Sequence, residues 1–156
     1  MKIVRFGVDN KVRYGILKGG YIQGIEDKPF RYIKSTDRYY RLSEVKLLSP
    51  CMPSKIVALG LNYYNHAREL NSPVPDAPLL FLKPSTAVIG PGDDIIYPAV
   101  SARVDYEGEL AVVIKRPVWR VSKEEALDYV LGYTCFNDVT ARDLQSQDEQ
   151  WTRAKG

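Results

Sequence analysis

The first 25 residues alternate between apolar and polar positions. Two successive runs have an apolar side chain at every second position: Val4, Phe6, Val8, Val12, Tyr14 and Ile16. Asp9-Asn10 and Gly19-Gly20 are typical of the tight turns that join antiparallel strands. Residues 26–41 are polar and poorly periodic, which indicates a loop or linker. We therefore predict a small β-rich N-terminal lobe over residues 1–50.

Short apolar runs and short helical patterns fill the rest of the chain. Five apolar or alternating runs predict strands, at residues 55–59, 79–83, 95–97, 104–114 and 133–137. Three capping residues, Asn62, Ser122 and Thr140, predict short helices, which contain residues 63–70, the apolar stripe of 126–131, and a turn through about residue 147. Strands and helices do not alternate regularly. The pattern favours a β-dominated α+β fold over a doubly wound parallel sheet.

The composition is that of a globular protein and excludes several other classes. Apolar residues make up 45% of the chain, and 22 basic and 19 acidic residues leave a net charge of +3. These charges are too balanced and dispersed for a nucleic-acid-binding protein. The sequence has no membrane-spanning run, which needs about 18 apolar residues, and no secretion signal in residues 1–10, so we predict a cytoplasmic protein. Its two cysteines, Cys51 and Cys135, do not form a disulfide or zinc-site pattern.

Acidic residues on one face of the predicted strand 104–114 suggest a site. Alternate residues of a strand share a face, so Asp105, Glu107 and Glu109 lie together, and this face turns apolar from Ala111. The carboxylates are therefore expected at the mouth of a core, where they raise one another's pKa unless a cation neutralises them. A solvated strand face explains the same pattern equally well.

Asp138 follows the predicted strand 133–137, where a side chain can project into a pocket. Taken alone, it is more simply a helix or turn cap. With Glu107 and Glu109 it supplies three carboxylates, a set that suits a hard divalent cation with positions left for water and substrate oxygens. The chain has one histidine, which excludes a His-rich zinc site.

That histidine, His66, lies three residues before Glu69 on a predicted helix. The spacing places both on one face, where the carboxylate would fix the imidazole tautomer and make His66 a general base toward water. From spacing alone, an exposed surface pair is the simpler explanation. Arg142, Gln145 and Lys155 form a polar C-terminal group that suits a substrate carboxylate or oxyanion, or a solvated helix face.

Read together, these segments resemble the fumarylacetoacetate hydrolase family, including its 2-hydroxyhepta-2,4-diene-1,7-dioate isomerase and acylpyruvate hydrolase-like members. The matching stretches occur in collinear order: Pro53–Val57, Gly60–Tyr63, His66–Glu69, Leu80–Pro84, Gly90–Gly92, Asp105–Leu110, Asn137–Gln145 and Trp151–Gly156. Each stretch alone is weak evidence for the family, whereas all of them in this order are highly specific for it. Residues 1–50 resemble the small N-terminal lobe of many members.

The resemblance implies a curled mixed β-structure, in which residues 53–156 form the N-terminal portion of a catalytic domain, and a homodimer. It also implies that Glu107, Glu109 and Asp138 bind Mg²⁺ or Mn²⁺, which chelates a small 2-oxo acid through its carboxylate and keto oxygens.

Catalytic roles follow from the same resemblance. His66 and Glu69 match the dyad that activates water. Lys155 matches the lysine that polarises the substrate or stabilises the enolate, and Arg142 and Gln145 match positions that contact the substrate.

We predict a metal-dependent enzyme that acts on a 2-oxo acid or its enol by C–C bond hydrolysis or isomerisation, through a metal-stabilised enolate. An oxaloacetate-type decarboxylase shares that intermediate, and an inactive family member keeps the same scaffold. Family members continue beyond Gly156 into further strands. We therefore expect residues 1–156 to be unstable, aggregation-prone or inactive without a separate C-terminal piece, because missing strands leave sheet edges unpaired.

Overall fold

The computed structural model describes residues 1–69 and 71–156, which form two compact units. Three segments make up each unit. Unit 1 contains Met1–Cys51, Ile89–Ile95 and Gly108–Phe136, and unit 2 contains Met52–Val88, Ile96–Glu107 and Asn137–Gly156. Strands predominate and the helices are short, which confirms the predicted β-dominated α+β fold.

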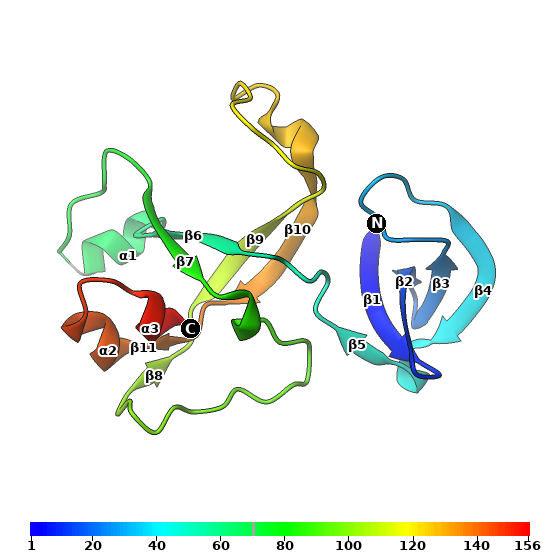
Figure 1. The fold of residues 1–156 in the computed structure, drawn as a ribbon, viewed down its shortest axis with the longest axis horizontal. Helices are drawn as coiled ribbons and strands as arrows, with labels where there is room; N and C mark the ends of the chain where they lie inside the picture. The colour runs from blue at the N-terminus through cyan, green and yellow to red at the C-terminus, as the bar shows by residue number, and fades with distance from the viewer. Residues whose placement is uncertain (70) are drawn as a thin grey trace. The chain divides into compact units, whose positions relative to one another are not determined.

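An antiparallel five-stranded sheet forms the main part of unit 1, with strand order β4-β3-β2-β1-β5 (Figure 1). Its strands are β1 (Lys2–Val8), β2 (Lys11–Lys18), β3 (Tyr21–Ile25), β4 (Ser35–Arg41) and β5 (Lys46–Leu48), with a 3₁₀ turn η1 (Leu42–Glu44) before β5. Both predicted turns are present. Asp9 and Asn10 have φ values of 48° and 57°, the left-handed conformation that a two-residue hairpin turn needs.

The first sequence interpretation that was wrong concerns residues 26–41. The predicted loop contains β4, which pairs with β3. Its polar character reflects its place at the edge of the sheet, where most side chains are exposed. Tyr40 points inward, and its ring packs on the fully buried Phe6 with centroids 5.1 Å apart.

The strand predicted over residues 104–114 is interrupted. It forms β8 (Val104–Asp105) in unit 2 and β9 (Gly108–Ile114) in unit 1, where β9 pairs with β10 (Val130–Asn137). Tyr106 and Glu107 lie in the break. The polar face of the run thus marks where the backbone leaves one sheet and enters another.

The predicted helix at residues 126–131 is replaced by one 3₁₀ turn, η3 (Ala126–Tyr129). Its capping box does form: the Ser122 hydroxyl donates to Glu125 Oε2 (3.1 Å), and the Glu125 N–H donates to Ser122 Oγ (3.3 Å). A longer helix would need an apolar face to bury, and Leu127 remains 69% exposed.

Unit 2 is built from short elements. They are β6 (Ile56–Gly60), α1 (Tyr64–Glu69), β7 (Leu79–Lys83), η2 (Ser85–Ala87), β8, β11 (Thr140–Ala141), α2 (Arg142–Gln147) and α3 (Thr152–Lys155). β6 pairs with β7 and β8 pairs with β11, both antiparallel. The strand predicted at residues 95–97 is not formed, and this segment runs as irregular backbone.

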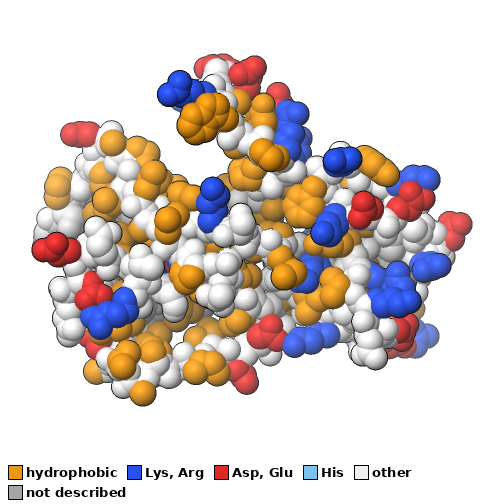
Figure 2. Space-filling model, viewed as in Figure 1, with side chains coloured by type: hydrophobic (Ala, Val, Ile, Leu, Met, Phe, Trp, Pro, Cys, Tyr) orange, Lys and Arg blue, Asp and Glu red, His pale blue; other side chains and the backbone are white. Residues whose placement is uncertain are grey.

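The core of unit 2 lies where β8, β11, α2 and α3 meet near the C-terminus (Figure 1). Ala141, Leu144 and Ala154 are buried there against Val104. Outside this core, large apolar side chains of β6 and β7 stay exposed, and Figure 2 shows hydrophobic side chains spread widely over the visible face. Among the described residues, no helix combines the length and hydropathy needed to cross a membrane.

Asp143 connects α2 to the segment that leads into β8. Its Oδ1 accepts hydrogen bonds from the Ser101 hydroxyl (2.6 Å) and the Leu144 N–H (3.0 Å), and its Oδ2 accepts from the Ala102 N–H (2.7 Å). These donors, the Ser101 hydroxyl first, lower the pKa of the Asp143 carboxyl below its ordinary value.

We expect Asp143→Asn to lower the thermal midpoint of unfolding at pH 7, and the deficit to shrink on acidification. A carboxylate with a lowered pKa stabilises the fold above its ordinary pKa, and this stabilisation is lost as the pH falls through the folded-state value. Thermal unfolding between pH 7 and pH 3 measures the effect. Asp76→Asn, which makes the same charge change at an exposed position, is the control. A deficit that does not change with pH would contradict the assignment.

Candidate active site

A buried cluster of carboxylates and ammonium groups lies at the core of unit 2. Asp138 and Lys155 are each 3% exposed, and Lys83 is 5% exposed. Lys155 Nζ donates to Glu107 Oε2 (2.7 Å) and to Asp138 Oδ2 (2.9 Å). Lys83 Nζ lies 2.6 Å from Asp138 Oδ1. Two lysines thus neutralise two carboxylates in a region with little water.

Backbone hydrogen bonds bring the two carboxylates together. Glu107 lies in the break between β8 and β9, and Asp138 lies between β10 and β11. The Asp138 N–H donates to the Glu107 carbonyl (2.8 Å), and the Glu107 N–H donates to Asn137 Oδ1 (3.1 Å). The Thr140 hydroxyl donates to the Asp138 carbonyl (2.9 Å). The interruption of the predicted strand is therefore what places Glu107 beside Asp138.

Aromatic packing positions Lys155 on α3. Its Nζ lies 5.1 Å from the centroid of the Phe81 ring, an arrangement that favours a cation. Phe81 meets Trp151 edge-on, with ring centroids 5.5 Å apart. Gly60 lets Trp151 approach β6, because a Cβ at that position would lie 2.7 Å from the indole ring.

Lys83 is the residue that the sequence interpretation missed. It was part of the Leu80–Pro84 match but received no role. Its Nζ donates to the carbonyl oxygens of Val139 (3.3 Å) and Lys155, in addition to its ion pair with Asp138. One feature of the sequence could have identified Lys83. It is the last residue of an apolar strand, directly before Pro84, at a position where the strand pattern predicts a side chain that faces inward.

Arg142 hydrogen-bonds to Glu107 of the cluster and to two further polar residues. Its guanidinium donates to Glu107 Oε1 (2.7 Å), Asp105 Oδ2 (3.1 Å) and Gln145 Oε1 (2.6 Å). The structure therefore brings Arg142, Gln145 and Lys155 together with Glu107 and Asp138, in line with their proposed roles around one site.

The charges around Glu107 determine its protonation. Burial, the largest single effect, raises the pKa of this carboxyl, but the hydrogen bonds and charges of Lys155 and Arg142 together lower it below its ordinary value. Burial lowers the pKa of the Arg142 guanidinium. Its hydrogen bonds and charge interactions with Asp105 and Glu107 outweigh burial and raise the pKa above its ordinary value. Both groups are therefore charged at neutral pH.

Two of the three proposed ligands, Glu107 and Asp138, meet in this cluster, and their assignment to a hard divalent cation stays a prediction. Within the described residues, no three His, Cys, Asp or Glu residues are close enough to hold an ion. Glu107 and Asp138 do meet, however, and the buried Asp138 Oδ1 accepts no hydrogen bond from a described residue. Lys83 is near enough to this oxygen for an ion pair but is not aligned for a hydrogen bond. The fit to a hard cation therefore rests on the two carboxylates that meet, Glu107 and Asp138.

Three further site positions were predicted, and the side chain of one of them is not described. Glu109, the third proposed ligand, is partly buried on β9 in unit 1. Glu69 is exposed near the end of α1. His66 lies in α1, but its side chain is outside the described part of the chain. The water-activating dyad of His66 and Glu69 therefore stays a prediction.

Two known protein families match successive parts of the chain. Residues 55–156 match the family described as fumarylacetoacetate (FAA) hydrolase, C-terminal. Residues 1–50 match the family described as Rv2993c-like, N-terminal. An Archaeoglobus fulgidus protein is 67% identical over 114 residues, which are 73% of this chain and 46% of that protein.

Two further relatives have named activities. The oxaloacetate tautomerase YisK of Bacillus subtilis is 49% identical over 117 residues, covering 72% of this chain and 39% of that protein. The crystal structure of 2-hydroxyhepta-2,4-diene-1,7-dioate isomerase from Mycobacterium marinum has a TM-score of 0.89 and 41% identity, covering 100% of this chain and 61% of that one. The chain thus spans about half the length of the curated relatives it matches.

We expect Lys83→Met to destabilise unit 2, because it removes one of the two cations that neutralise the buried Asp138. Breaking a buried ion pair on one side costs about 3–5 kcal/mol. Denaturant unfolding in the presence of a chelator, followed by Trp151 fluorescence in a Trp119→Phe background, measures this loss. Lys55→Met, at an exposed position, should be near neutral. Equal unfolding midpoints for the two variants would show that Lys83 does not neutralise Asp138.

Proposed function

Because the chain belongs to the fumarylacetoacetate hydrolase family, we propose that it forms part of a divalent-metal-dependent enzyme acting on a small 2-oxo acid or its enol. The proposed reaction is C–C bond hydrolysis or isomerisation. The observation that carries the proposal is the buried cluster of Glu107, Asp138 and Lys155, with its two short ammonium–carboxylate contacts. A purely structural core of this size would rarely bury so many charged groups.

The proposed metal ligands are Glu107, Asp138 and Glu109, with Mg²⁺ or Mn²⁺ as the ion. When bound, such an ion supplies Lewis-acid chemistry: it draws electron density from the carboxylate and keto oxygens of a 2-oxo acid and makes the C3 proton more acidic. Glu107 suits this task, because Lys155 and Arg142 hold the pKa of its carboxyl below the ordinary value.

The remaining residues act on the substrate directly. The Lys155 ammonium is positioned by Phe81 and α3 to donate a hydrogen bond to an oxygen that gains negative charge when C3 loses its proton. The Arg142 guanidinium and the Gln145 amide, 2.6 Å apart, are suited to orient a carboxylate of the substrate. His66, oriented by Glu69, would remove a proton from the attacking water in a hydrolase.

A second candidate function is keto–enol tautomerisation or decarboxylation of oxaloacetate. It is favoured by the names of two relatives, the oxaloacetate tautomerases of Bacillus subtilis and Xenopus laevis. Tautomerisation moves a proton between C3 and the keto oxygen, and no water has to attack. The two candidates therefore use Lys155 and the carboxylates in the same way and differ in their need for His66. Both proposals include the prediction that the protein is a homodimer in the cytoplasm.

We expect Glu107→Gln in the full-length protein to weaken Mn²⁺ binding by at least about tenfold and to reduce turnover in parallel. The amide is a poorer ligand for a hard cation, and it also loses the ion pair with Lys155. Electron paramagnetic resonance of free Mn²⁺ measures the affinity, and Mg²⁺ competition gives that of Mg²⁺. Glu149→Gln, at an exposed position of unit 2, should leave both unchanged. Unaltered metal affinity in Glu107→Gln would rule out the ligand assignment.

The role of His66 separates the two candidate functions. If the protein is a hydrolase, His66→Ala should slow acylpyruvate hydrolysis by about 10²–10⁴-fold, while oxaloacetate tautomerisation and decarboxylation persist. Rates with acylpyruvates, oxaloacetate and 2-hydroxydienoates in Mg²⁺ measure this, and the neighbouring Asn65→Ala is the control. An equal decrease in every activity would contradict a role limited to water activation.

A further inference from the structure

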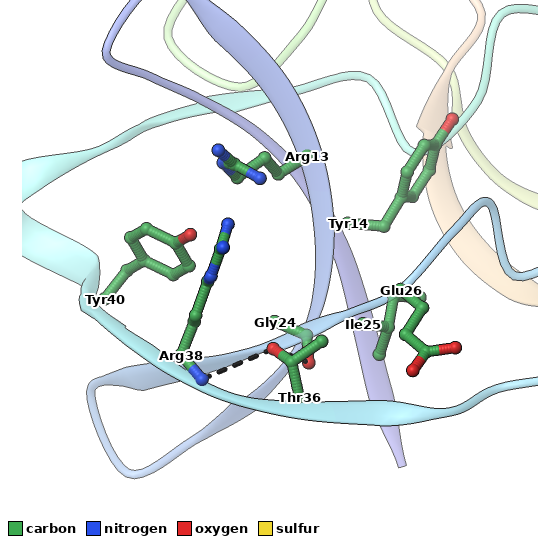
Figure 3. A pocket seen from close by; sticks show the side chains of 8 residues that line it. All are labelled: Arg13, Tyr14, Gly24, Ile25, Glu26, Thr36, Arg38 and Tyr40. Carbon is green, nitrogen blue, oxygen red and sulfur yellow. Dashed lines mark hydrogen bonds between the residues drawn. The ribbon is translucent and has the colours of Figure 1, made fainter.

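A pocket of about 240 Å³ lies in the five-stranded sheet of unit 1, and residues of unit 1 line it. Arg13 on β2, Gly24 on β3, and Thr36, Arg38 and Tyr40 on β4 line it (Figure 3). The pairing of β3 with β4 shifts register between Gln23 and Ile25, so the pocket lies at an irregularity of the sheet. Such irregularities redirect side chains and are frequent at functional sites.

Side-chain hydrogen bonds hold the backbone rigid at this irregularity. The Thr36 hydroxyl donates to the Gly24 carbonyl (3.1 Å) and accepts from the Arg38 N–H (3.3 Å). Gln23 Nε2 donates to the Thr36 carbonyl (3.2 Å). Gly24 is required for the close approach, because a Cβ there would lie 2.9 Å from Thr36 Oγ1. These contacts fix the backbone of β3 and β4 beside the pocket.

Two guanidinium groups, of Arg13 and Arg38, reach into this pocket, and no carboxylate of the described residues forms an ion pair with either. Figure 3 shows the side chains of Arg13 and Arg38 directed to the same side of the pocket. Arg13 Nε is buried and has no hydrogen-bond partner among the described residues. Glu26 also lines the pocket, but its carboxylate points away from both arginines and pairs with Lys34 at 2.7 Å.

This arrangement is unfavourable for an empty pocket and favourable for a bound anion. Two like charges repel each other, and a buried N–H without an acceptor loses its hydration. A carboxylate or phosphate group accepts hydrogen bonds from the planar guanidinium fork and neutralises both charges at once. Tyr40, held in place against Phe6, offers an aromatic surface to a short carbon chain.

We propose that this pocket binds a small anion through Arg13 and Arg38, with a carboxylate or phosphate group as the part recognised. The ligand is limited to a few carbon atoms, because the pocket is smaller than the roughly 300–1,000 Å³ that drug-sized molecules occupy. All residues that line the site belong to unit 1. The site gives the N-terminal lobe a binding function of its own.

The test uses malonate and inorganic phosphate as probes, titrated into the ¹⁵N-labelled full-length protein at constant ionic strength maintained with NaCl. We expect saturable shifts of the Gly24 and Ile25 amides and of the Arg13 side-chain resonance. Arg13→Gln and Arg38→Gln should each raise the dissociation constant at least about tenfold, since each removes a charged hydrogen-bond donor. Arg41→Gln, on the same strand but outside the pocket and paired with Glu44 at 3.5 Å, should bind like the unaltered protein.

The outcomes separate specific binding from general salt effects. Tighter binding of malonate assigns the site to carboxylates, and tighter binding of phosphate assigns it to phosphate esters. Shifts that grow linearly with either probe, or an equal weakening in Arg38→Gln and Arg41→Gln, would overturn the proposal. Because Arg38 is exposed, its variant is expected to fold and keeps the test decisive even if Arg13→Gln does not fold. Glu107→Gln should leave anion binding intact, which distinguishes this site from the one in unit 2.

Discussion

Neutralisation of the buried Asp138 carboxylate is the constraint on which the rest of unit 2 depends. A carboxylate that is 3% exposed is unstable in its charged form unless cations and donors surround it. Lys155 comes from α3 and Lys83 from the end of β7, so neutralising one side chain fixes the positions of two separate elements. Lys83 also binds the Lys155 carbonyl, which links both lysines into one network.

The same network explains why the backbone departs from a regular sheet at Glu107. A continuous strand over residues 104–114 would keep Glu107 in register with its neighbours and leave its carboxylate on a strand face. The break between β8 and β9 instead lets the Glu107 carbonyl accept the Asp138 N–H. Lys155 then binds both carboxylates at once. A local loss of strand pairing is therefore offset by the charged contacts that it makes possible.

Features set by local backbone chemistry could be predicted from the sequence, while those set by distant partners could not. The turn at Asp9-Asn10 and the strands β1, β6 and β7 follow from residue types within a few positions. β4 was missed because an edge strand has little apolar alternation. The helix predicted at residues 126–131 was wrong because a good cap cannot replace an apolar face to bury. Lys83 was missed for a related reason: its role exists only through Asp138, which is 55 residues away in the chain.

Charge balance indicates why an acidic substrate suits the proposed site. Lys83 and Lys155 neutralise Glu107 and Asp138, and Arg142 has Asp105 as an additional partner. With a divalent cation bound, the ion and the two lysines would together carry four positive charges. Glu107 and Asp138 would carry two negative charges. Glu109 would supply a third negative unit. The carboxylate of a 2-oxo acid would supply the fourth, so binding an anionic substrate is favoured by the same electrostatics that pair Lys83 and Lys155 with Glu107 and Asp138.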